Sequence, residues 1–217
     1  MGVYPGDESA SGSDDPSLLT TMHVRRAQGG DLESLRWVVE RLSPVLLSQA
    51  RYRLRGPLAS VCDPEDLVNE VWMRTLPHLE RIGSDQARVT PALVAYLSRA
   101  LLARANGMIE RHLRGQGLDP NESRPEADEL PDGTVGVVTR VVRDERNNEL
   151  LTAIDGLAES DREILVLRAV EQSSNGEVAE LLGLAPSAVT MRYKRAMERL
   201  HDRLPGSVFD ELDAAAS

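Results

Sequence analysis

Apolar residues recur every three or four positions along most of this chain, which is the spacing of helices that bury one face. One such face begins near Asp31 and includes Leu35, Val39 and Leu42. No window alternates apolar and polar residues over the length of a strand, and the one β-branched cluster, at 135–142, is interrupted by glycine and arginine. We therefore expect an all-α fold.

Proline and acidic residues mark where several of these helices begin or change. We expect Pro44 to kink or restart the helix that begins near Asp31, because proline donates no backbone hydrogen bond. Residues 63–66, Asp-Pro-Glu-Asp, combine an N-cap acceptor, a proline at the first helical position and acids in the first turn. That helix should end near Pro77. A further start at Thr90-Pro91 predicts a helix that runs to Gly115.

Two S-x-x-E segments, Ser160–Glu163 and Ser174–Glu177, fit the capping box, in which the serine and the glutamate satisfy each other's backbone amides. Each predicts the start of a short helix. The last helix should begin at Pro186 and end near Leu204. Between residues 115 and 140, glycines, prolines and acids leave no amphipathic period, which predicts a linker.

The distribution of charge supports this division. Although the formal net charge is −10, residues 36–115 carry 12 basic and 8 acidic side chains, whereas residues 116–161 carry 4 basic and 12 acidic ones. We expect two small helical domains joined by an acidic flexible linker. The expected parts are a disordered tail (1–17), a first domain (18–115), the linker (116–144), a second domain (145–204) and an acidic tail (205–217).

Composition excludes several classes of function. The single cysteine, Cys62, rules out an internal disulfide and a cysteine-rich zinc site, and the four histidines are scattered. We find no glycine-rich phosphate loop and no catalytic triad, so we expect neither an enzyme nor a bound cofactor or metal. No apolar run approaches the roughly 18 residues of a membrane helix, and the acidic N-terminus is unlike a signal peptide. We therefore expect no membrane insertion and a cytoplasmic location.

Residues 175–195 have the pattern of a helix-turn-helix. Two short amphipathic helices are joined by a turn at Gly183, where a tight conformation requires glycine. The second helix should bury Val189, Tyr193, Ala196 and Leu200. Its opposite face offers small residues and cations that suit base edges and phosphates in a DNA major groove. The residues of that face are Ser187, Ala188, Thr190, Met191, Arg192, Lys194 and Arg195. The alternative is an ordinary helical hairpin with solvated arginines.

Two parts of the chain resemble the extracytoplasmic-function (ECF, group IV) sigma factors of the sigma-70 family. Residues 63–74, Asp-Pro-Glu-Asp-Leu-Val-Asn-Glu-Val-Trp-Met-Arg, are similar to the D-x-E-D-L-x-Q-E-V-F-x-R segment of region 2. Residues 157–200 are similar to region 4, through segments 161–168, 177–183 and 189–192. The resemblance covers residues 20–115 and 145–204. It implies a region 2 helical bundle and a region 4 helix-turn-helix.

The resemblance also implies a function and its site residues. It implies an alternative RNA polymerase sigma factor that binds core polymerase, through its β′ and β subunits, and directs promoter-specific transcription initiation. The exposed face of the helix-turn-helix would read the −35 element. The residues implied to dock on a basic coiled coil of β′ are Asp63, Asp66, Leu67, Glu70, Val71 and Arg74. Those implied to contact and open the −10 element are Tyr96, Arg99, Arg104, Asn106, Arg111 and Arg114.

Several of these interpretations have plainer alternatives. Asp66, Glu70 and Arg74 also fit a solvated helix face, with a Glu70–Arg74 pair contributing only about 0.3–0.5 kcal/mol. Tyr96, where the family commonly has tryptophan, fits a core position equally well. The acidic linker is either a solvated spacer or, as the family's linker is thought to be, a nucleic-acid mimic in the RNA-exit path of the polymerase.

The alternative function is a stand-alone helix-turn-helix DNA-binding transcriptional regulator. Such a protein binds duplex DNA by itself, usually as a dimer and with a steep dependence on salt. The low net basicity of both predicted domains favours a sigma factor, which binds free duplex poorly. No residue pattern in the sequence indicates the promoter sequence or the inducing signal. An anti-sigma factor remains an alternative further partner.

Overall fold

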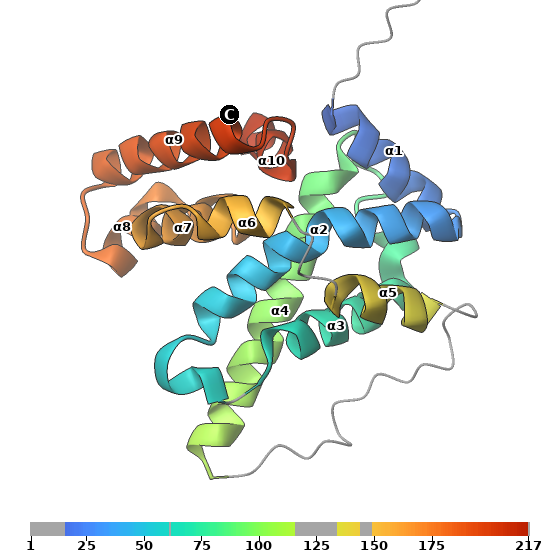
Figure 1. The fold of residues 1–217 in the computed structure, drawn as a ribbon, viewed down its shortest axis with the longest axis horizontal. Coiled ribbons are helices and arrows are strands. Elements are labelled where there is room, and N and C mark those ends of the chain that lie inside the picture. The colour runs from blue at the N-terminus through green and yellow to red at the C-terminus, as the bar shows by residue number, and fades with distance from the viewer. Residues whose placement is uncertain (1–15, 61, 116–133, 144–148, 217) are drawn as a thin grey trace, which may run out of the picture.

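The computed structural model describes residues 16–60, 62–115, 134–143 and 149–216, and every regular element in these ranges is a helix (Figure 1). The predicted all-α fold is therefore confirmed. None of the described helices is both long enough and apolar enough to cross a membrane. The segments predicted to be the disordered tail and most of the acidic linker, 1–15 and 116–133, lie outside the described residues.

The N-terminal lobe is built around one long helix, α2 (Leu32–Arg53). Helices α1 (Pro16–Gln28), α3 (Pro64–Thr75) and α4 (Val89–Leu113) pack against it. Two 3₁₀ turns, η1 (Gly56–Ser60) and η2 (Leu76–Arg81), connect these helices. At the centre, the fully buried Trp72 donates its indole N–H to Ser43 Oγ at 3.0 Å, which satisfies the only polar atom of the ring.

The helix starts predicted at Asp31 and Asp63 agree with the structure, whereas α4 begins at Val89 with Arg88 as its N-cap, two residues before the start expected at Thr90-Pro91. Asp31 caps α2 by accepting from the amide of Glu33, and Asp63 caps α3 by accepting from the amide of Glu65. Pro44 was expected to kink or restart α2, and the helix does not restart there, because α2 runs unbroken from Leu32 to Arg53. Pro44 and the six residues that follow it are all buried, so packing holds the helix together where one backbone hydrogen bond is missing.

The C-terminal lobe contains α6 (Glu149–Asp155), α7 (Glu159–Leu165), the π-helical turn η5 (Val166–Val170), α8 (Asn175–Leu182) and α9 (Pro186–Arg203). Of the two expected capping boxes, the one at Ser174 is confirmed and the one at Ser160 is wrong. The N-cap of α7 is Ala158, two residues before the expected cap, so Ser160 lies within the first turn of the helix.

Two segments that we expected to lack structure are helices. Part of the expected linker is α5 (Thr134–Arg143), which packs on α2 and α3 with Val138 and Val142 buried. Part of the expected acidic tail is α10 (Val208–Ala216), which buries Phe209 and Leu212. These two buried pairs have helical spacing, i, i+4 in α5 and i, i+3 in α10. A single pair does not establish a helical period beside the surrounding glycines, prolines or acids.

The two lobes are not held apart. One continuous cluster of buried apolar side chains extends from the N-terminal lobe into α6, η5, α9 and α10. Helix α10 contacts α1, α4, η5 and α9, so it lies between the lobes (Figure 1). The described residues thus form two helical lobes that share one buried apolar core.

Candidate nucleic-acid interface

The helix-turn-helix is fixed by its caps. Ser174 and Glu177 exchange hydrogen bonds at 2.7 and 3.2 Å and complete the capping box of α8. The bond from the Ser174 backbone amide lowers the pKa of the Glu177 carboxyl. At the other end of α8, Gly183 has φ 64°, the left-handed conformation that the turn requires.

A small apolar core sets the angle between α8 and α9. Leu167, Val178, Ala179 and Val189 form a separate buried cluster. Along α9, the expected buried positions Val189, Ala196 and Leu200 are confirmed, and Met197 is a buried position that the spacing did not identify.

Tyr193 of α9 was expected to be buried, but its side chain is only half-buried. Its ring lies 5.5 Å from the Arg168 guanidinium, and its pKa is raised by burial and then by Asp213. It therefore contacts both the C-terminal lobe and α10 rather than the core alone.

The opposite face of α9 faces solvent, as predicted. Met191 is 51 % exposed, and Arg192, Lys194 and Arg195 are exposed beside it. Thr190 accepts from Asn175 Nδ2 at 3.0 Å and donates to the Pro186 carbonyl at 3.2 Å, which ties the N-terminus of α9 to the start of α8. Ser187 is exposed and Ala188 is half-buried. The predicted −35 residues thus lie on one helix and almost all of them on its outer face.

On α3, the residues expected to dock on polymerase divide into two groups. Asp63 and Asp66 are exposed and the Arg74 side chain is 49 % exposed. Leu67 and Val71, which the resemblance implied as docking contacts, are fully buried in the lobe's own core, so their side chains are not accessible to a partner in this conformation.

Glu70 also lies inside the lobe. Its carboxylate receives Arg104 Nε at 2.6 and 2.7 Å and Arg74 Nε at 2.9 Å, and its side chain is 10 % exposed. The Glu70–Arg74 pair expected from the sequence is present, but Glu70 does not lie on a solvated helix face. Its bond to Arg104 links a residue expected to bind polymerase with one expected to bind DNA, and the sequence did not indicate this link.

On α4, the six residues expected to contact the −10 element do not share one surface. Arg99 and Asn106 are exposed, whereas Tyr96 is half-buried and packs on the core, as its plainer interpretation held. Arg104 is engaged with Glu70, and Arg114 pairs with Glu110 at 2.9 Å. Arg111 is half-buried and donates to the Gly107 carbonyl at 3.2 Å.

A cavity of about 720 Å³ adjoins the exposed part of α4. Tyr96 and Arg99 line one side, and Arg168 and Gln172 of the C-terminal lobe line the other. The cavity also meets Leu212 of α10. Residues from both lobes therefore line the cavity beside two of the expected −10 residues, Tyr96 and Arg99.

Comparison with known proteins assigns the family. Residues 147–200 match the family model for Sigma-70, region 4. The chain is 30 % identical over 184 residues to the ECF RNA polymerase sigma factor SigD of Mycobacterium bovis, which covers 83 % of this chain and 82 % of that protein. The chain belongs to the ECF RNA polymerase sigma factors.

A second relative extends the match along the chain. The ECF sigma factor ShbA of Streptomyces griseus is 29 % identical over 188 residues, which span 86 % of this sigma factor and 96 % of ShbA. No solved structure matches. The region 4 match spans α6 to most of α9, and α10 lies beyond it. This sigma factor acts in promoter-specific transcription.

Proposed function

We propose that this sigma factor reads the −35 element with the outer face of α9 and docks on core polymerase through the outer edge of α3. The observation that carries the proposal is the helix-turn-helix itself. Its capped α8, left-handed Gly183 and exposed cationic α9 together form a rigid element that a major groove accommodates.

The chemistry of α9 supports its role in recognition. Ser187 and Ala188 near its N-terminus are small enough to permit close approach to base edges. Farther along, Arg192 and Arg195 are exposed and can reach guanine or phosphate. A bidentate contact from arginine to guanine contributes about 1–3 kcal/mol of discrimination. Arg192 is therefore the residue to test first.

The docking surface on α3 is narrower than the sequence suggested. Asp63, Asp66 and Arg74 remain accessible, and acids at the start of a helix suit a basic partner such as a β′ coiled coil. Glu70 acts as a positioning residue, since it holds Arg74 on one side and Arg104 on the other.

On α4, Arg99 and Asn106 are the accessible candidates for the −10 element. Arg104 supports the helix through Glu70 instead of reaching DNA. The nucleotidyl transfer belongs to the polymerase, so this protein needs no catalytic group, cofactor or metal of its own. It acts in the cytoplasm, where core polymerase and the chromosome are.

In vitro transcription with purified core polymerase on a pool of genomic fragments tests the function. New start sites should appear only when this protein is added. Arg192→Ala should reduce that transcription by about 5- to 150-fold, the equivalent of 1–3 kcal/mol, while co-purification with core is unchanged. Arg36→Ala, which removes an exposed pair with Glu40, is the matched control. Unchanged footprints on the upstream element with Arg192→Ala would refute the role of α9.

A second variant separates docking from recognition. Asp66→Lys reverses an exposed charge on α3 and should abolish co-purification with core without unfolding the protein. Wild-type yield of the complex would contradict the docking assignment. Specific binding of the free protein to a duplex without polymerase would instead support the stand-alone regulator.

A further inference from the structure

The cavity of about 720 Å³ beside α4 has a basic lining. Arg81 of η2, Arg99 of α4 and Arg168 of η5 reach it from three different elements, and His78 adds a fourth basic side chain. None of the described residues that line the cavity is acidic. The cavity is therefore strongly cationic in a chain whose formal net charge is −10.

These arginines have hydrogen-bond donors that the protein does not use. Arg168 Nη1 donates to the Ser173 carbonyl, and no other guanidinium nitrogen of Arg168 has a hydrogen-bond partner within the described residues. Arg99 is exposed, and no acid in the described part of the chain pairs with it. Arg81 reaches only its neighbour Glu80, at 3.8 Å. Convergent guanidinium groups with donors to spare are the groups that bind phosphates.

One side of the same cavity is apolar. Tyr96 is half-buried there, and Ile82 and Leu212 are buried. Ala92 and Ala95 share the cavity-lining face of α4 with Tyr96, and their short side chains leave space beside its ring. An aromatic ring next to apolar side chains suits a flat heterocycle, which stacks on it.

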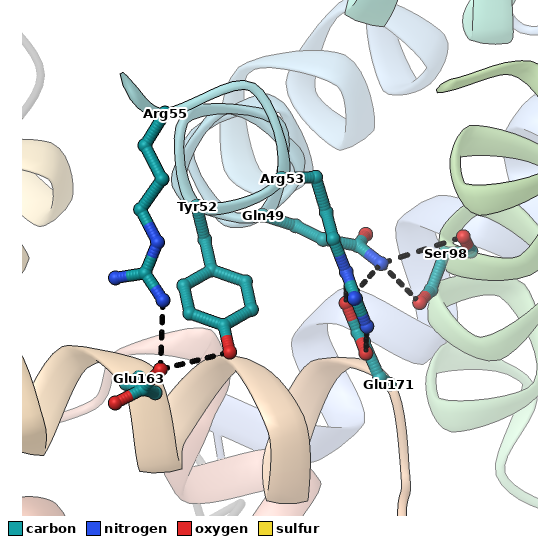
Figure 2. A network of polar contacts seen from close by, with 7 residues as sticks. All are labelled: Gln49, Tyr52, Arg53, Arg55, Ser98, Glu163 and Glu171. Carbon is teal, nitrogen blue, oxygen red and sulfur yellow. Dashed lines mark hydrogen bonds and ion pairs between the residues drawn. The ribbon is translucent and has the colours of Figure 1, made fainter. Parts of the chain in front are cut away.

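Hydrogen bonds hold two walls of the cavity next to each other (Figure 2). Gln49 Nε2 donates to Ser98 Oγ of α4 at 2.9 Å and to Glu171 Oε1 at 3.1 Å. Ser98 directly precedes Arg99, and Glu171 directly precedes Gln172, so the amide of one α2 residue positions both walls.

The end of α2 is bonded to the C-terminal lobe in the same network (Figure 2). Arg53 Nε donates to Glu171 at 2.9 Å, and Glu163 of α7 accepts from Tyr52 Oη at 2.9 Å and from Arg55 Nη2 at 2.8 Å. Burial, and then the hydrogen bond to Glu163, raise the pKa of Tyr52 to about 12, so the phenol stays a donor at neutral pH.

Helix α1 holds the third wall, which is the connection between η2 and α4. Gln28 Nε2 donates to the Ile82 carbonyl at 2.9 Å, and Arg25 Nη2 donates to the Gln86 carbonyl at 2.6 Å. Gly83, between these two anchors, has φ 63°, a conformation that favours glycine. The cavity is thus formed before any ligand enters, which lowers the cost of binding.

The backbone beside Arg168 is also unusual. Arg168 lies in the π-helical turn η5, and Gln172 shortly after it has φ 56°. Gln172 is the one residue other than glycine with a positive φ in the described ranges. Both π-turns and such backbone strain concentrate at functional sites.

We propose that this cavity binds a nucleoside di- or triphosphate. Its phosphates lie against Arg81, Arg99 and Arg168, and its base stacks on Tyr96. Three guanidinium groups from three elements match a chain of phosphates better than a single one, and the volume is within the range of about 300–1,000 Å³ of small-molecule sites. Arg99 is also a candidate for the −10 element, so nucleotide and promoter strand would compete for it. Only this consequence rests on the proposed function.

Calorimetric titration of the full-length free protein tests the class of ligand. ATP and GTP should each bind more tightly than inorganic triphosphate, which lacks the base, and more tightly than adenosine, which lacks the phosphates. Because no acid lines the cavity among the described residues, binding should persist in EDTA. Absence of binding by both nucleotides at millimolar concentration would overturn the proposal, as would equal affinity for triphosphate or loss of binding in EDTA.

Substitutions test the place of binding. Arg168→Gln should weaken binding about 10- to 150-fold, the contribution of a hydrogen bond to a charged group. Ala95→Leu, which keeps every charge but fills space, should weaken it as well. Arg36→Gln, an exposed arginine of α2 outside the cavity, is the matched control and should change nothing. Wild-type affinity in both Arg168→Gln and Ala95→Leu would overturn this site.

A further variant keeps the test valid if Arg168→Gln does not fold. The Arg81 side chain is 75 % exposed, so Arg81→Gln cannot disturb the core, and it should weaken binding up to about 5-fold. Circular dichroism checks that each variant stays helical. If Arg168→Gln loses its helical signal, unchanged affinity in Arg81→Gln and Ala95→Leu would overturn the site.

Competition distinguishes a free nucleotide from a DNA strand, which also carries phosphates and bases. Fluorescent ATP bound to the free protein should be displaced by unlabelled ATP at lower concentration than by a single-stranded oligonucleotide of ten nucleotides. Stronger displacement by the oligonucleotide would assign the cavity to promoter DNA and overturn the proposal. If the protein directs no transcription, the proposed function fails, whereas the binding measurements remain valid.

Discussion

Replacement of Glu70 tests whether a buried carboxylate organises the N-terminal lobe. Its side chain is 10 % exposed and that of its partner Arg104 is 13 % exposed, with nitrogen–oxygen distances of 2.6 and 2.7 Å. Removing one member of such a pair leaves a charge in a poorly hydrated site, which costs about 3–5 kcal/mol when burial is complete. Because some exposure remains, we expect Glu70→Gln to lower the free energy of unfolding by about 3 kcal/mol.

The contribution of Arg74 to this cost is small. Its side chain is 49 % exposed, and an exposed i, i+4 pair contributes only about 0.3–0.5 kcal/mol. If both buried partners become apolar, neither charge of this pair is left in the poorly hydrated site, so Glu70→Leu with Arg104→Met should lie within about 1 kcal/mol of wild type. The double variant should thus be more stable than Glu70→Gln alone.

Urea denaturation followed by circular dichroism measures these differences. The single variant should also melt about 6–12 °C lower, since 1 kcal/mol shifts a chain of this size by about 2–4 °C. Glu110→Gln, which removes an exposed pair with Arg114 on α4, should change stability by less than about 0.5 kcal/mol. The reasoning fails if Glu70→Gln is as stable as this control, or if the double variant is less stable than the single one.

Two further predictions follow from particular contacts. Ser174→Ala should destabilise the C-terminal lobe by about 1 kcal/mol, because it removes the capping box with Glu177. The backbone amides at the start of α8 should then exchange hydrogen faster, as measured by mass spectrometry. Unchanged exchange would contradict this prediction. Tyr52 should ionise near pH 12, because its pKa in the folded protein lies above the ordinary value of 10. Its contribution to stability is therefore complete below pH 10 and is lost as the pH rises from 10 to 12. The absorbance difference near 295 nm between wild type and Tyr52→Phe measures the midpoint of this ionisation. Glu163→Gln should shift the midpoint toward pH 10, and a wild-type midpoint already at pH 10 would refute the prediction.

Local sequence signals predicted much of this molecule correctly. The caps at Asp31, Asp63 and Ser174 lie where expected, and so does the turn at Gly183. Each depends on residues within one turn of one another, so a single sequence contains the information needed. The same holds for the outer face of α9, because helical spacing determines which residues oppose the buried ones.

Other features required the tertiary structure. The sequence places Glu70 on a charged face of α3 with Asp66 and Arg74. Only the packing of α4 makes it a buried partner of Arg104, which is 34 residues away in the chain. The resemblance to region 2 implied Leu67 as a docking residue, but in the structure its side chain is fully buried in the core of its own lobe. Helical periodicity identifies the apolar face but not whether a second helix of the same chain already covers it.

The sequence by itself determined most of the helices, the caps at Asp31, Asp63 and Ser174 and the cationic face of α9, and through its motifs it indicated an ECF sigma factor. Only the tertiary structure decided that the lobes close on each other, with Thr20 and Glu211 bonded across 191 positions of the chain. The physical reason lies in the range of the interactions. Backbone hydrogen bonds and caps act within a few residues, whereas charges and apolar faces select partners by proximity in the folded molecule.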